Sequence, residues 1–306
     1  MDFKDIDLSL KEQLNKYLYR FGNNSCQYSF AQMLGLKMKY HDQYAIDDNV
    51  LYIHRKLRDT DGKRVYLAPL GVDCHDENGF TGAIDRILKD ALQHNSKVIF
   101  ETVTESCADM LAKCYPGVFD ITADRNMSEY VYLSTELYDL PGRGLSPKRN
   151  RVRAFYNAYD SDDISIECIN MKNIEDVKIF QEEWMAGRRT DESYSGLETE
   201  NEAIKLYLDK FDYLDFSGIV VYVNGTVAGY AAGVPLSDSC MDEVIEKGRH
   251  DVIGIYQVLC REFAGLAKKK YEYINREEDI GSPGLRRAKE SYMPYRLIDK
   301  YVVNQK

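Results

Sequence analysis

Residues 217–246, SGIVVYVNGTVAGYAAGVPLSDSCMDEVIE, hold two runs of β-branched and aromatic residues on either side of Asn224-Gly225. An Asn-Gly pair between such runs favours a two-residue turn that joins antiparallel strands. We therefore predict strands over 217–223 and 226–235, followed by a third strand over 239–246. We expect this three-stranded meander to form the middle of a sheet in the second half of the chain.

Helical and extended patterns alternate on both sides of this meander. Apolar residues recur at helical spacing from Val252 to Leu266, which predicts a helix. Ser282-Pro283 is a typical helix start, with the serine as a cap and the proline in the first turn. The predicted order is a helix over 146–159, a strand over 164–169, helices over 174–188 and 199–214, the meander, the helix over 252–266, a strand over 271–274, a helix over 282–292 and a strand over 296–303.

The first half repeats this order of elements without repeating the residues. The predicted elements are a strand over 2–8, helices over 9–20 and 29–39, strands over 44–46, 50–54 and 64–70, a helix through 83–92, a strand over 97–103, a helix over 104–115 and strands over 119–123 and 129–133. Pro141-Gly142-Arg143-Gly144 is the clearest boundary signal. We expect an α/β protein with mixed sheets, built from domains at 1–140 and 141–306, with helix 146–159 bridging them.

Composition narrows the classes of function. The chain has 306 residues, with 40 Lys and Arg against 50 Asp and Glu, so its net charge is −10. Such a balance argues against a protein that coats DNA. We find no signal peptide and no transmembrane segment. Seven scattered cysteines indicate reduced thiols in a cytoplasmic protein. Cys74-His75-Asp76 is interpreted as a polar loop, so no metal site is predicted.

Three segments carry a resemblance to a known family: PKRN at 147–150, VIEK at 244–247 and YINREEDIGSPGLRRAKESY at 273–292. With the repeated order of elements, they resemble tandem proteins of the GCN5-related N-acetyltransferase (GNAT) superfamily. Within it, the chain is most similar to the C-terminal domain family of phosphatidylglycerol lysyltransferase, which is related to Fem-type aminoacyl transferases. The resemblance implies two tandem GNAT (acyl-CoA N-acyltransferase) folds, each with a gap between its fourth and fifth strands that admits an acyl donor.

A basic segment lies at the start of the bridging helix. Residues 143–153 contain Arg143, Lys148, Arg149, Arg151 and Arg153 and no acid. The helix dipole disfavours cations in the first turn unless an anion binds there. Lys148, Arg149 and Asn150 are therefore candidate anion-binding residues, for a phosphate of tRNA, a nucleotide or a lipid head group. The alternative is a solvated basic face.

A second polar segment follows the strand at 271–274. Close carboxylates raise the pKa of one another, so an acid among Glu277, Glu278 and Asp279 is a candidate base. Arg276 and Arg286 are candidates for bidentate binding of a carboxylate or phosphate. Asn275 and Lys289 complete this set of substrate-binding candidates. The alternative is a solvated turn whose acids cap the next helix.

Two further candidates come from the resemblance. Many GNAT enzymes use a tyrosine near the last helix as a general acid, which implies this role for Tyr292 or Tyr295, with Tyr292 as the candidate; the alternative is a core or surface role for either one. Glu246, in the VIEK segment, is the implied base. Glu243 and Glu246 are three residues apart on one strand, so alternation predicts that they point to opposite faces and that at most one faces the gap.

The donor and acceptor remain open at this level. Acetyl-CoA-dependent relatives carry an R/Q-x-x-G-x-G/A loop, and neither 71–79 nor 248–254 matches it. We therefore expect no tightly bound cofactor and favour an aminoacyl-tRNA donor, held by tRNA contacts at 143–153. The acceptor is an amine or hydroxyl of a small molecule or peptide. The alternatives are an acyl-CoA-dependent N-acyltransferase and a catalytically inactive GNAT-like binding module.

Overall fold

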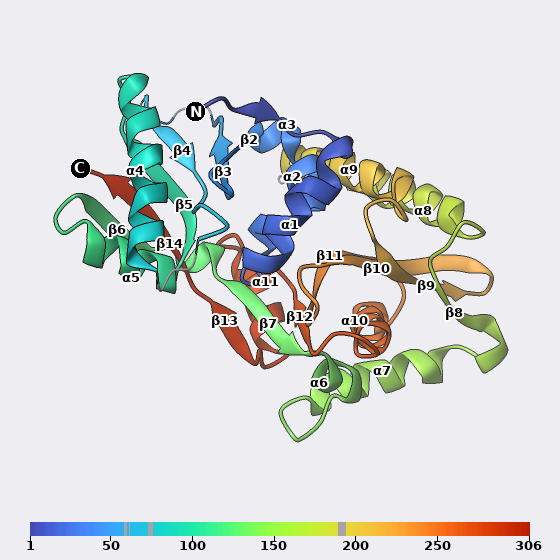
Figure 1. Cartoon of the computed structure of the whole chain (residues 1–306). Helices are drawn as coiled ribbons and strands as arrows, with labels where there is room; N and C mark the ends of the chain where they lie inside the picture. The colour runs from blue at the N-terminus through green and yellow to red at the C-terminus, as the bar shows by residue number, and fades with distance from the viewer. Residues whose placement is uncertain (58–59, 61, 73–75, 189–193) are drawn as a thin grey trace. The chain divides into compact units, whose positions relative to one another are not determined.

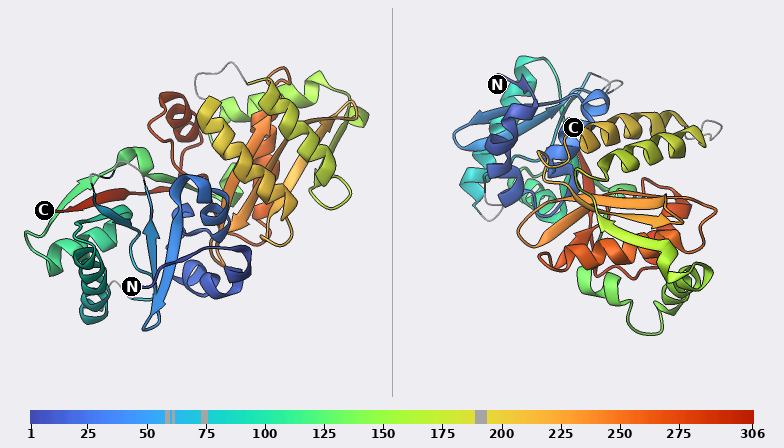
Figure 2. Two further views of the ribbon diagram at one scale, coloured as in Figure 1. Left: turned by 90° about the horizontal axis from the view of Figure 1, so that it is seen from above. Right: turned by 90° about the vertical axis from the view of Figure 1, so that its right-hand side faces the viewer.

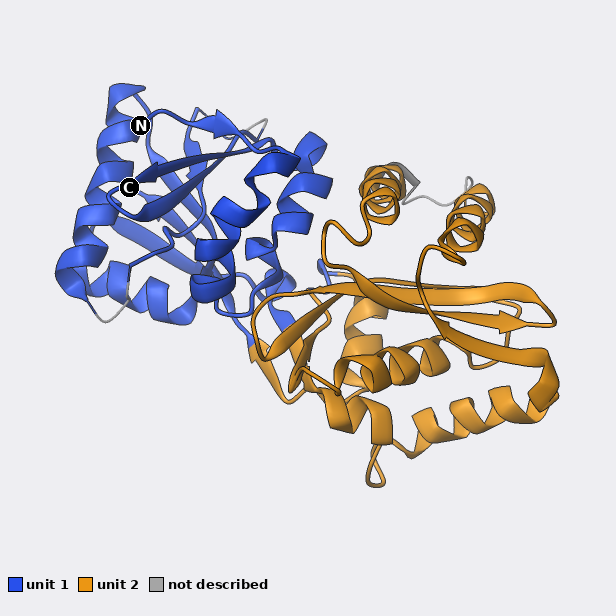
Figure 3. Ribbon diagram, turned by 45° about the vertical axis from the view of Figure 1, so that its right-hand side comes forward, with its two compact units in different colours: residues 1–129, 278–281, 298–306 blue, residues 130–277, 282–297 orange. Residues whose placement is uncertain are grey.

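The computed structural model describes residues 1–57, 60, 62–72, 76–188 and 194–306, and Figures 1 and 3 show its elements and its two compact units. Unit 1 consists of residues 1–129, 278–281 and 298–306, and unit 2 of residues 130–277 and 282–297. The predicted boundary at residue 140 differs from this division, because residues 130–140 belong to unit 2 and the C-terminal segment belongs to unit 1. Cys74 and His75 lie outside the described residues.

Unit 1 is built on a seven-stranded sheet in the order β1-β2-β3-β4-β5-β14-β6. Its strands are β1 (Lys4–Asp5), β2 (Asp42–Asp47), β3 (Val50–Arg55), β4 (Arg64–Tyr66), β5 (Val98–Thr104), β6 (Phe119–Ala123) and β14 (Lys300–Gln305). Asp48 and Asn49 take positive φ angles between β2 and β3, as a two-residue hairpin turn requires.

The helices of unit 1 cover both faces of this sheet (Figures 1 and 2). They are α1 (Lys11–Phe21), α2 (Phe30–Gly35), α3 (Lys37–Tyr40), α4 (Glu77–Gln93) and α5 (Glu105–Cys114), with short 3-10 turns at Leu8–Leu10, Cys26–Tyr28 and Arg125–Met127. The predicted apolar stripe of α4 is buried: Phe80, Ala83, Ile84 and Ile87 pack with Phe100 in one core cluster. This burial fixes α4 on the sheet.

Unit 2 has its own seven-stranded sheet, in the order β13-β7-β12-β11-β10-β9-β8. Its strands are β7 (Glu129–Leu133), β8 (Ile164–Cys168), β9 (Ser217–Val223), β10 (Thr226–Pro235), β11 (Cys240–Gly248), β12 (Tyr273–Asn275) and β13 (Arg296–Ile298). The predicted Asn224-Gly225 turn joins β9 to β10, and both residues take positive φ angles. The meander at the centre of the sequence interpretation is therefore confirmed.

Helices lie on both faces of the second sheet, as Figure 3 shows. They are α6 (Ser134–Asp139), α7 (Ser146–Ala158), α8 (Ile174–Ala186), α9 (Tyr194–Asp209), α10 (Ile255–Ala267) and α11 (Pro283–Glu290), with a 3-10 turn at Ser161–Asp163. α10 packs on β9, β10 and β11 from the side that also holds α7, and α8 packs on the opposite face. Ser282 caps α11 and Pro283 opens it, as predicted.

The two units exchange strands, which the sequence interpretation did not anticipate. β7 follows the first half in the chain but pairs with β12 of unit 2, whereas β14 closes the chain but pairs with β5 and β6 of unit 1. The predicted last strand, 296–303, is therefore two strands in two different sheets. Within unit 1, Val303 is fully buried, and the fully buried Lys300 Nζ lies 2.7 Å from Glu129 Oε1 and 2.6 Å from Ser25 Oγ. Apolar burial and a closed ion pair thus hold β14 in place.

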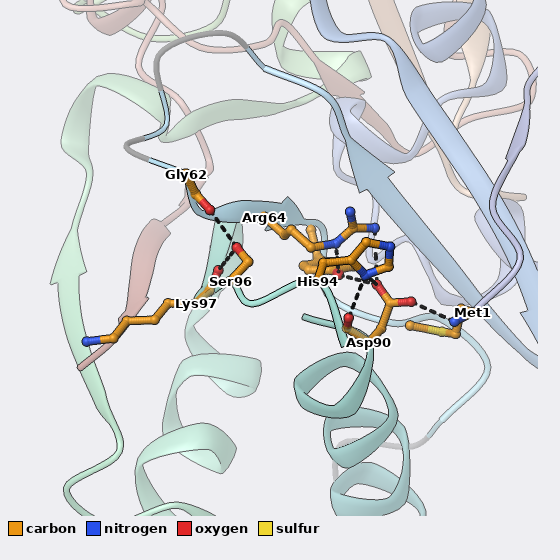
Figure 4. A network of polar contacts seen from close by, with 8 residues as sticks. Met1, Gly62, Arg64, Asp90, His94, Ser96 and Lys97 are labelled. Carbon is orange, nitrogen blue, oxygen red and sulfur yellow. Dashed lines mark hydrogen bonds and ion pairs between the residues drawn. The ribbon is translucent and has the colours of Figure 1, made fainter. Parts of the chain in front are cut away.

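Unit 1 also neutralises a second buried acid. Figure 4 shows Asp90 of α4 among its donors. Its carboxylate has no exposed surface and accepts hydrogen bonds from the α-ammonium of Met1 (2.6 Å) and the Tyr66 hydroxyl (2.6 Å). Arg64 Nη2 forms an ion pair with it at 3.1 Å. Although burial opposes ionisation, these donors lower the pKa of Asp90 overall.

Within the part of the chain that the structure describes, no helix combines the length and apolar character needed to cross a membrane.

Candidate active site

The candidate site lies where two parallel strands of unit 2 separate. β11 and β12 pair through Cys240 with Tyr273, Met241 with Ile274 and Asp242 with Asn275. Beyond these pairs β11 continues to Gly248, whereas β12 ends at Asn275. Glu243 and Arg276 are therefore the first residues past the last pair. Openings at the carboxyl ends of parallel strands are a common place for ligand-binding side chains in α/β folds.

A β-bulge determines which side chains face this opening. In the β10–β11 ladder, Ala232 pairs with Ile245 and Gly233 pairs with Glu243, so Val244 is an extra residue. The bulge shifts the alternation by one position and turns Glu243 and Glu246 to the same face. The prediction that they point to opposite faces is therefore wrong. A Cβ on Gly233 would lie 1.8 Å from the Asp242 carbonyl oxygen, so the bulged strand requires glycine there.

Arg276 joins the two glutamates. Its Nη2 lies 2.6 Å from Glu246 Oε2, and its Nε donates a hydrogen bond to Glu243 Oε2. The side chains of Arg276, Glu243 and Glu246 expose 12%, 2% and 18% of their surface. Burial and the neighbouring Glu243 carboxylate raise the pKa of Glu246 to about 8, although Arg276 opposes this shift. Proton transfer is most effective when the pKa of the group lies near the working pH.

Two lysines and a tyrosine surround this arginine. Lys289 Nζ of α11 donates to the Arg276 carbonyl oxygen at 2.6 Å. Lys148 Nζ, from the first turn of α7, lies 4.1 Å from the centre of the Tyr292 ring, and Arg276 Cζ lies 5.2 Å from the same centre. Burial lowers the pKa of Lys148 and raises that of Tyr292. We call Lys148, Glu243, Glu246, Arg276, Lys289 and Tyr292 the Arg276 cluster.

The remaining anion-binding candidates are Arg149 and Asn150 of α7 and Arg286 of α11. The Arg149 guanidinium donates to the carbonyl oxygens of Leu140 and Gly142, in the loop that follows α6. Asn150 is exposed on α7, and Arg286 is half-buried on α11. The Arg149 contacts explain a cation in the first helical turn without an anionic ligand, because main-chain carbonyls take its donors.

The three consecutive acids are divided between the units. Glu277 belongs to unit 2, has a positive φ and donates its N–H to Oδ1 of the buried Asn275 at 2.8 Å. Glu278 and Asp279 belong to unit 1. There, the Cys26 thiol lies 3.5 Å from Glu278 Oε2, and the fully buried Asp279 pairs with Arg125 at 3.3 Å. The acids therefore do not form one carboxylate cluster within either unit.

Glu243 is the member of the cluster that sequence reasoning missed. Simple strand alternation assigned it to the face opposite Glu246, and only the bulge reverses that assignment. The one local signal was Gly233 inside a long strand pattern, since an isolated glycine in a strand indicates a bulge or a close backbone approach. Among the described residues, no group of three or more His, Cys, Asp or Glu side chains is placed to hold a metal ion.

Comparisons with known proteins agree with this architecture. The family model of the phosphatidylglycerol lysyltransferase C-terminal domain matches residues 20–304. A conserved protein of unknown function from Bacteroides thetaiotaomicron is 27% identical, and the match covers all of both chains with a TM-score of 0.91. L-PGS from Bacillus licheniformis is 15% identical, with 99% of this chain and 93% of that chain covered and a TM-score of 0.68.

A tandem GNAT protein from the clavulanic acid biosynthesis pathway is 9% identical, with 99% and 98% of the chains covered and a TM-score of 0.51. This likeness and the two mixed sheets confirm the predicted fold class, two tandem GNAT folds. An uncharacterized protein from Mycoplasmoides gallisepticum, MYCGA3080, is 23% identical over 183 residues, which is 58% of this chain. The match spans about half the length of that curated relative, 56% of it.

Proposed function

Because the chain belongs to the phosphatidylglycerol lysyltransferase C-terminal domain family, we propose that it transfers an acyl or aminoacyl group from an activated ester to an amine or hydroxyl acceptor. Its family and its GNAT fold support an acyltransferase-type role. The observation that carries the proposal is the Arg276 cluster, which gathers a base, a proton donor and three cations where β11 and β12 separate.

Each residue of the cluster has a chemical role in this proposal. Glu246, once ionised, takes the proton from the attacking nitrogen or oxygen as that atom bonds to the donor carbonyl. The Lys148 ammonium stabilises the oxyanion or an anionic part of the donor. Tyr292 keeps its proton because burial raises its pKa. It can therefore donate this proton to the leaving oxygen as the ester bond breaks, and the proton that Glu246 has taken then returns to the Tyr292 oxygen through water. Arg276 holds the two glutamates in position.

An aminoacyl-tRNA is the donor that we favour. Arg143, Arg151 and Arg153 are exposed along the start of α7 in a chain whose net charge is −10, so this surface is suited to phosphates. An acyl-CoA donor has less support. In the loop before α10 the Arg249 guanidinium is engaged by both oxygens of Asp251, at 3.1 and 2.8 Å, where a coenzyme would present its pyrophosphate.

The direct test is to incubate the purified protein with a panel of labelled aminoacyl-tRNAs and follow loss of the aminoacyl ester with and without amine acceptors. Glu246→Gln should slow transfer about 100-fold or more, because general base catalysis is worth roughly that factor. Glu198→Gln, an exposed position on α9, is the matched control and should leave the rate unchanged. Equal rates in the two variants would contradict the role of Glu246.

The remaining outcomes separate the alternatives. Thermal stabilisation by acetyl-CoA or a longer acyl-CoA, without any tRNA deacylation, would favour the acyl-CoA-dependent enzyme. Binding of tRNA at low salt with no transfer would favour a binding module that kept the fold and lost the chemistry. No deacylation and no binding of any aminoacyl-tRNA would refute the proposed donor.

A further inference from the structure

The centre of the Arg276 cluster holds two carboxylates and one guanidinium. Arg276 gives one contact to Glu246 and one to Glu243, so a single positive charge is divided between two acids. Both acids are largely buried, and Glu243 is 6% exposed as a whole residue. A buried carboxylate that lacks its full share of a cation is strongly destabilising, and the usual remedy is protonation.

One oxygen of Glu243 points to the same conclusion independently. Its Oε2 accepts from Arg276 Nε, whereas the buried Oε1 has no hydrogen-bond donor among the described residues. Buried carboxylate oxygens normally have a donor, because an unmet acceptor loses its hydration without compensation. The bulge at Val244 brings Glu246 to the same face, so a proton on Glu246 is placed to supply this donor.

The other groups around the pair come from several elements. The titratable and charged side chains that face it are Arg276 after β12, Lys289 of α11, Tyr292 after α11, Lys148 of α7, Cys260 and Tyr256 of α10 and Tyr132 of β7. Arg276 and Lys289 favour an ionised Glu246, whereas burial and Glu243 favour the proton, and the second group of effects is larger.

We infer that Glu243 and Glu246 hold one proton between them, and that Glu243 is a positioning residue that acts through Glu246. In neutral solution Glu246 is then a carboxylic acid that donates to Glu243 Oε1. It becomes a base only as the pH rises far enough to remove the shared proton. The catalytic meaning of this proton rests on the proposed function, but its presence does not.

The test is the titration of the glutamate carboxyl carbons by NMR, with no donor or acceptor present. In the unmodified protein we expect one carboxyl with a midpoint at about 8, assigned to Glu246 by its loss in Glu246→Gln. In Glu243→Gln the amide oxygen accepts from Arg276 and the amide NH₂ donates to Glu246. The variant therefore supplies the hydrogen bond without a proton, and the midpoint should fall by about one pH unit or more.

Glu243→Asp keeps the charge and should keep most of the elevated midpoint, while the control Glu198→Gln should not move it. A Glu246 midpoint below about 6 in the unmodified protein would overturn the inference, since an ordinary carboxyl titrates near 4.3. An unchanged midpoint in Glu243→Gln would overturn the role of Glu243. If that variant does not fold, Glu243→Ala decides, because it removes the second carboxylate and must lower the Glu246 midpoint by about one pH unit or more.

The titration and the transfer assay fail separately. An elevated midpoint in a protein that transfers nothing would refute the proposed function and leave the shared proton intact. Transfer by a protein whose Glu246 titrates normally would refute the shared proton and leave the function intact. If both hold, the transfer rate should rise with pH through the same midpoint, and Glu243→Gln should shift that profile to lower pH.

Discussion

Each unit contains an arginine between two carboxylates, and the two arginines differ in geometry. In unit 1, Arg55 of β3 lies opposite Asp42 of β2 and holds it with two contacts, at 2.9 and 3.2 Å, and its Nη1 lies 3.5 Å from Glu101. In unit 2, Arg276 gives a single contact to each of Glu243 and Glu246. Units of one fold thus use an arginine between two carboxylates differently.

The number of contacts that the guanidinium makes with each carboxylate distinguishes an arginine with a structural role from one that tunes the protonation of its partners. Two parallel N–H···O contacts satisfy both the charge and the orientation of Asp42, which leaves that carboxylate nothing further to bind. A divided guanidinium leaves two acids on one strand to repel each other. The pKa of Glu246 rises to about 8, so its proton can move near neutral pH. The four predictions below compare the two units, and two of them test the contrast between Arg55 and Arg276.

The largest expected effect comes from deleting β14, the strand at the end of the chain that lies in the sheet of unit 1. Deletion of residues 299–306 removes the strand between β5 and β6, so that β5 keeps only β4 as a neighbour, and it leaves Glu129 without Lys300. We expect β5 and β6 to lose hydrogen-exchange protection entirely, while β9 and β10 keep theirs. Val302→Ala, on a half-buried position of β14, is the control. Retained protection in β5 would show that unit 1 does not depend on the exchanged strand.

The second effect is on the stability contributed by each arginine. Arg55→Leu leaves Asp42 buried without a partner and should lower the free energy of unfolding by about 3–5 kcal/mol in urea. Arg276→Leu should cost less, because Glu246 can take a proton and is partly exposed. Equal losses in the two variants would contradict the proposed contrast.

The elements of the fold were predictable because their signals are local. Asn224-Gly225 determines a turn within four residues, and the apolar stripes of α4 and α10 identify their buried faces directly. The exchange of β7 and β14 was not predictable. β14 pairs with β5, about 200 residues earlier in the chain, and nothing in its own alternation specifies which sheet it joins.

The site was predictable in part, for a related reason. The basic and polar segments supplied Lys148, Arg276 and Lys289, and the resemblance supplied Glu246 and Tyr292; the structure brings all five together in unit 2. Alternation failed at Val244, since a bulge depends on the partner strand and on a glycine that lies eleven residues away in the sequence. Arg149 is a different case. The sequence suggested an anion-binding role because a cation is unfavourable in the first turn of a helix, but in the fold its guanidinium donates to main-chain carbonyls.

The third prediction concerns acid sensitivity in unit 1. His54 of β3 is 5% exposed and its Nδ1 has no hydrogen-bond partner in the described residues. Burial lowers the pKa of His54 to about 4. Between pH 6.5 and 4, His54 therefore binds a proton in the unfolded chain but not in the folded chain. The free energy of unfolding falls as the pH falls through this range. The loss should be about 3 kcal/mol.

Urea unfolding of the unmodified protein and of His54→Phe, measured from pH 7 to pH 4.5, isolates this effect as the difference between the two curves. The phenylalanine ring joins those of Phe3 and Tyr66, which already contact His54. The variant should lose less stability on acidification. A difference that stays constant with pH would show that His54 takes up its proton over the same pH range in the folded and the unfolded chain.

The last effect has the opposite pH dependence and comes from Glu246 in unit 2. Its pKa is raised in the folded state, so the folded protein binds a proton between pH 4.5 and about 8 that the unfolded chain has released. Stability from this group is complete below pH 4.5 and is lost as the pH rises toward 8. We expect a loss of several kcal/mol across this window, because each unit of pKa difference between the folded and unfolded states is worth about 1.4 kcal/mol. Glu246→Gln cannot titrate, so its stability relative to the unmodified protein should rise with pH through this window. A relative stability that falls with pH instead would mean that Arg276 outweighs burial, and the two arginines would then be equivalent.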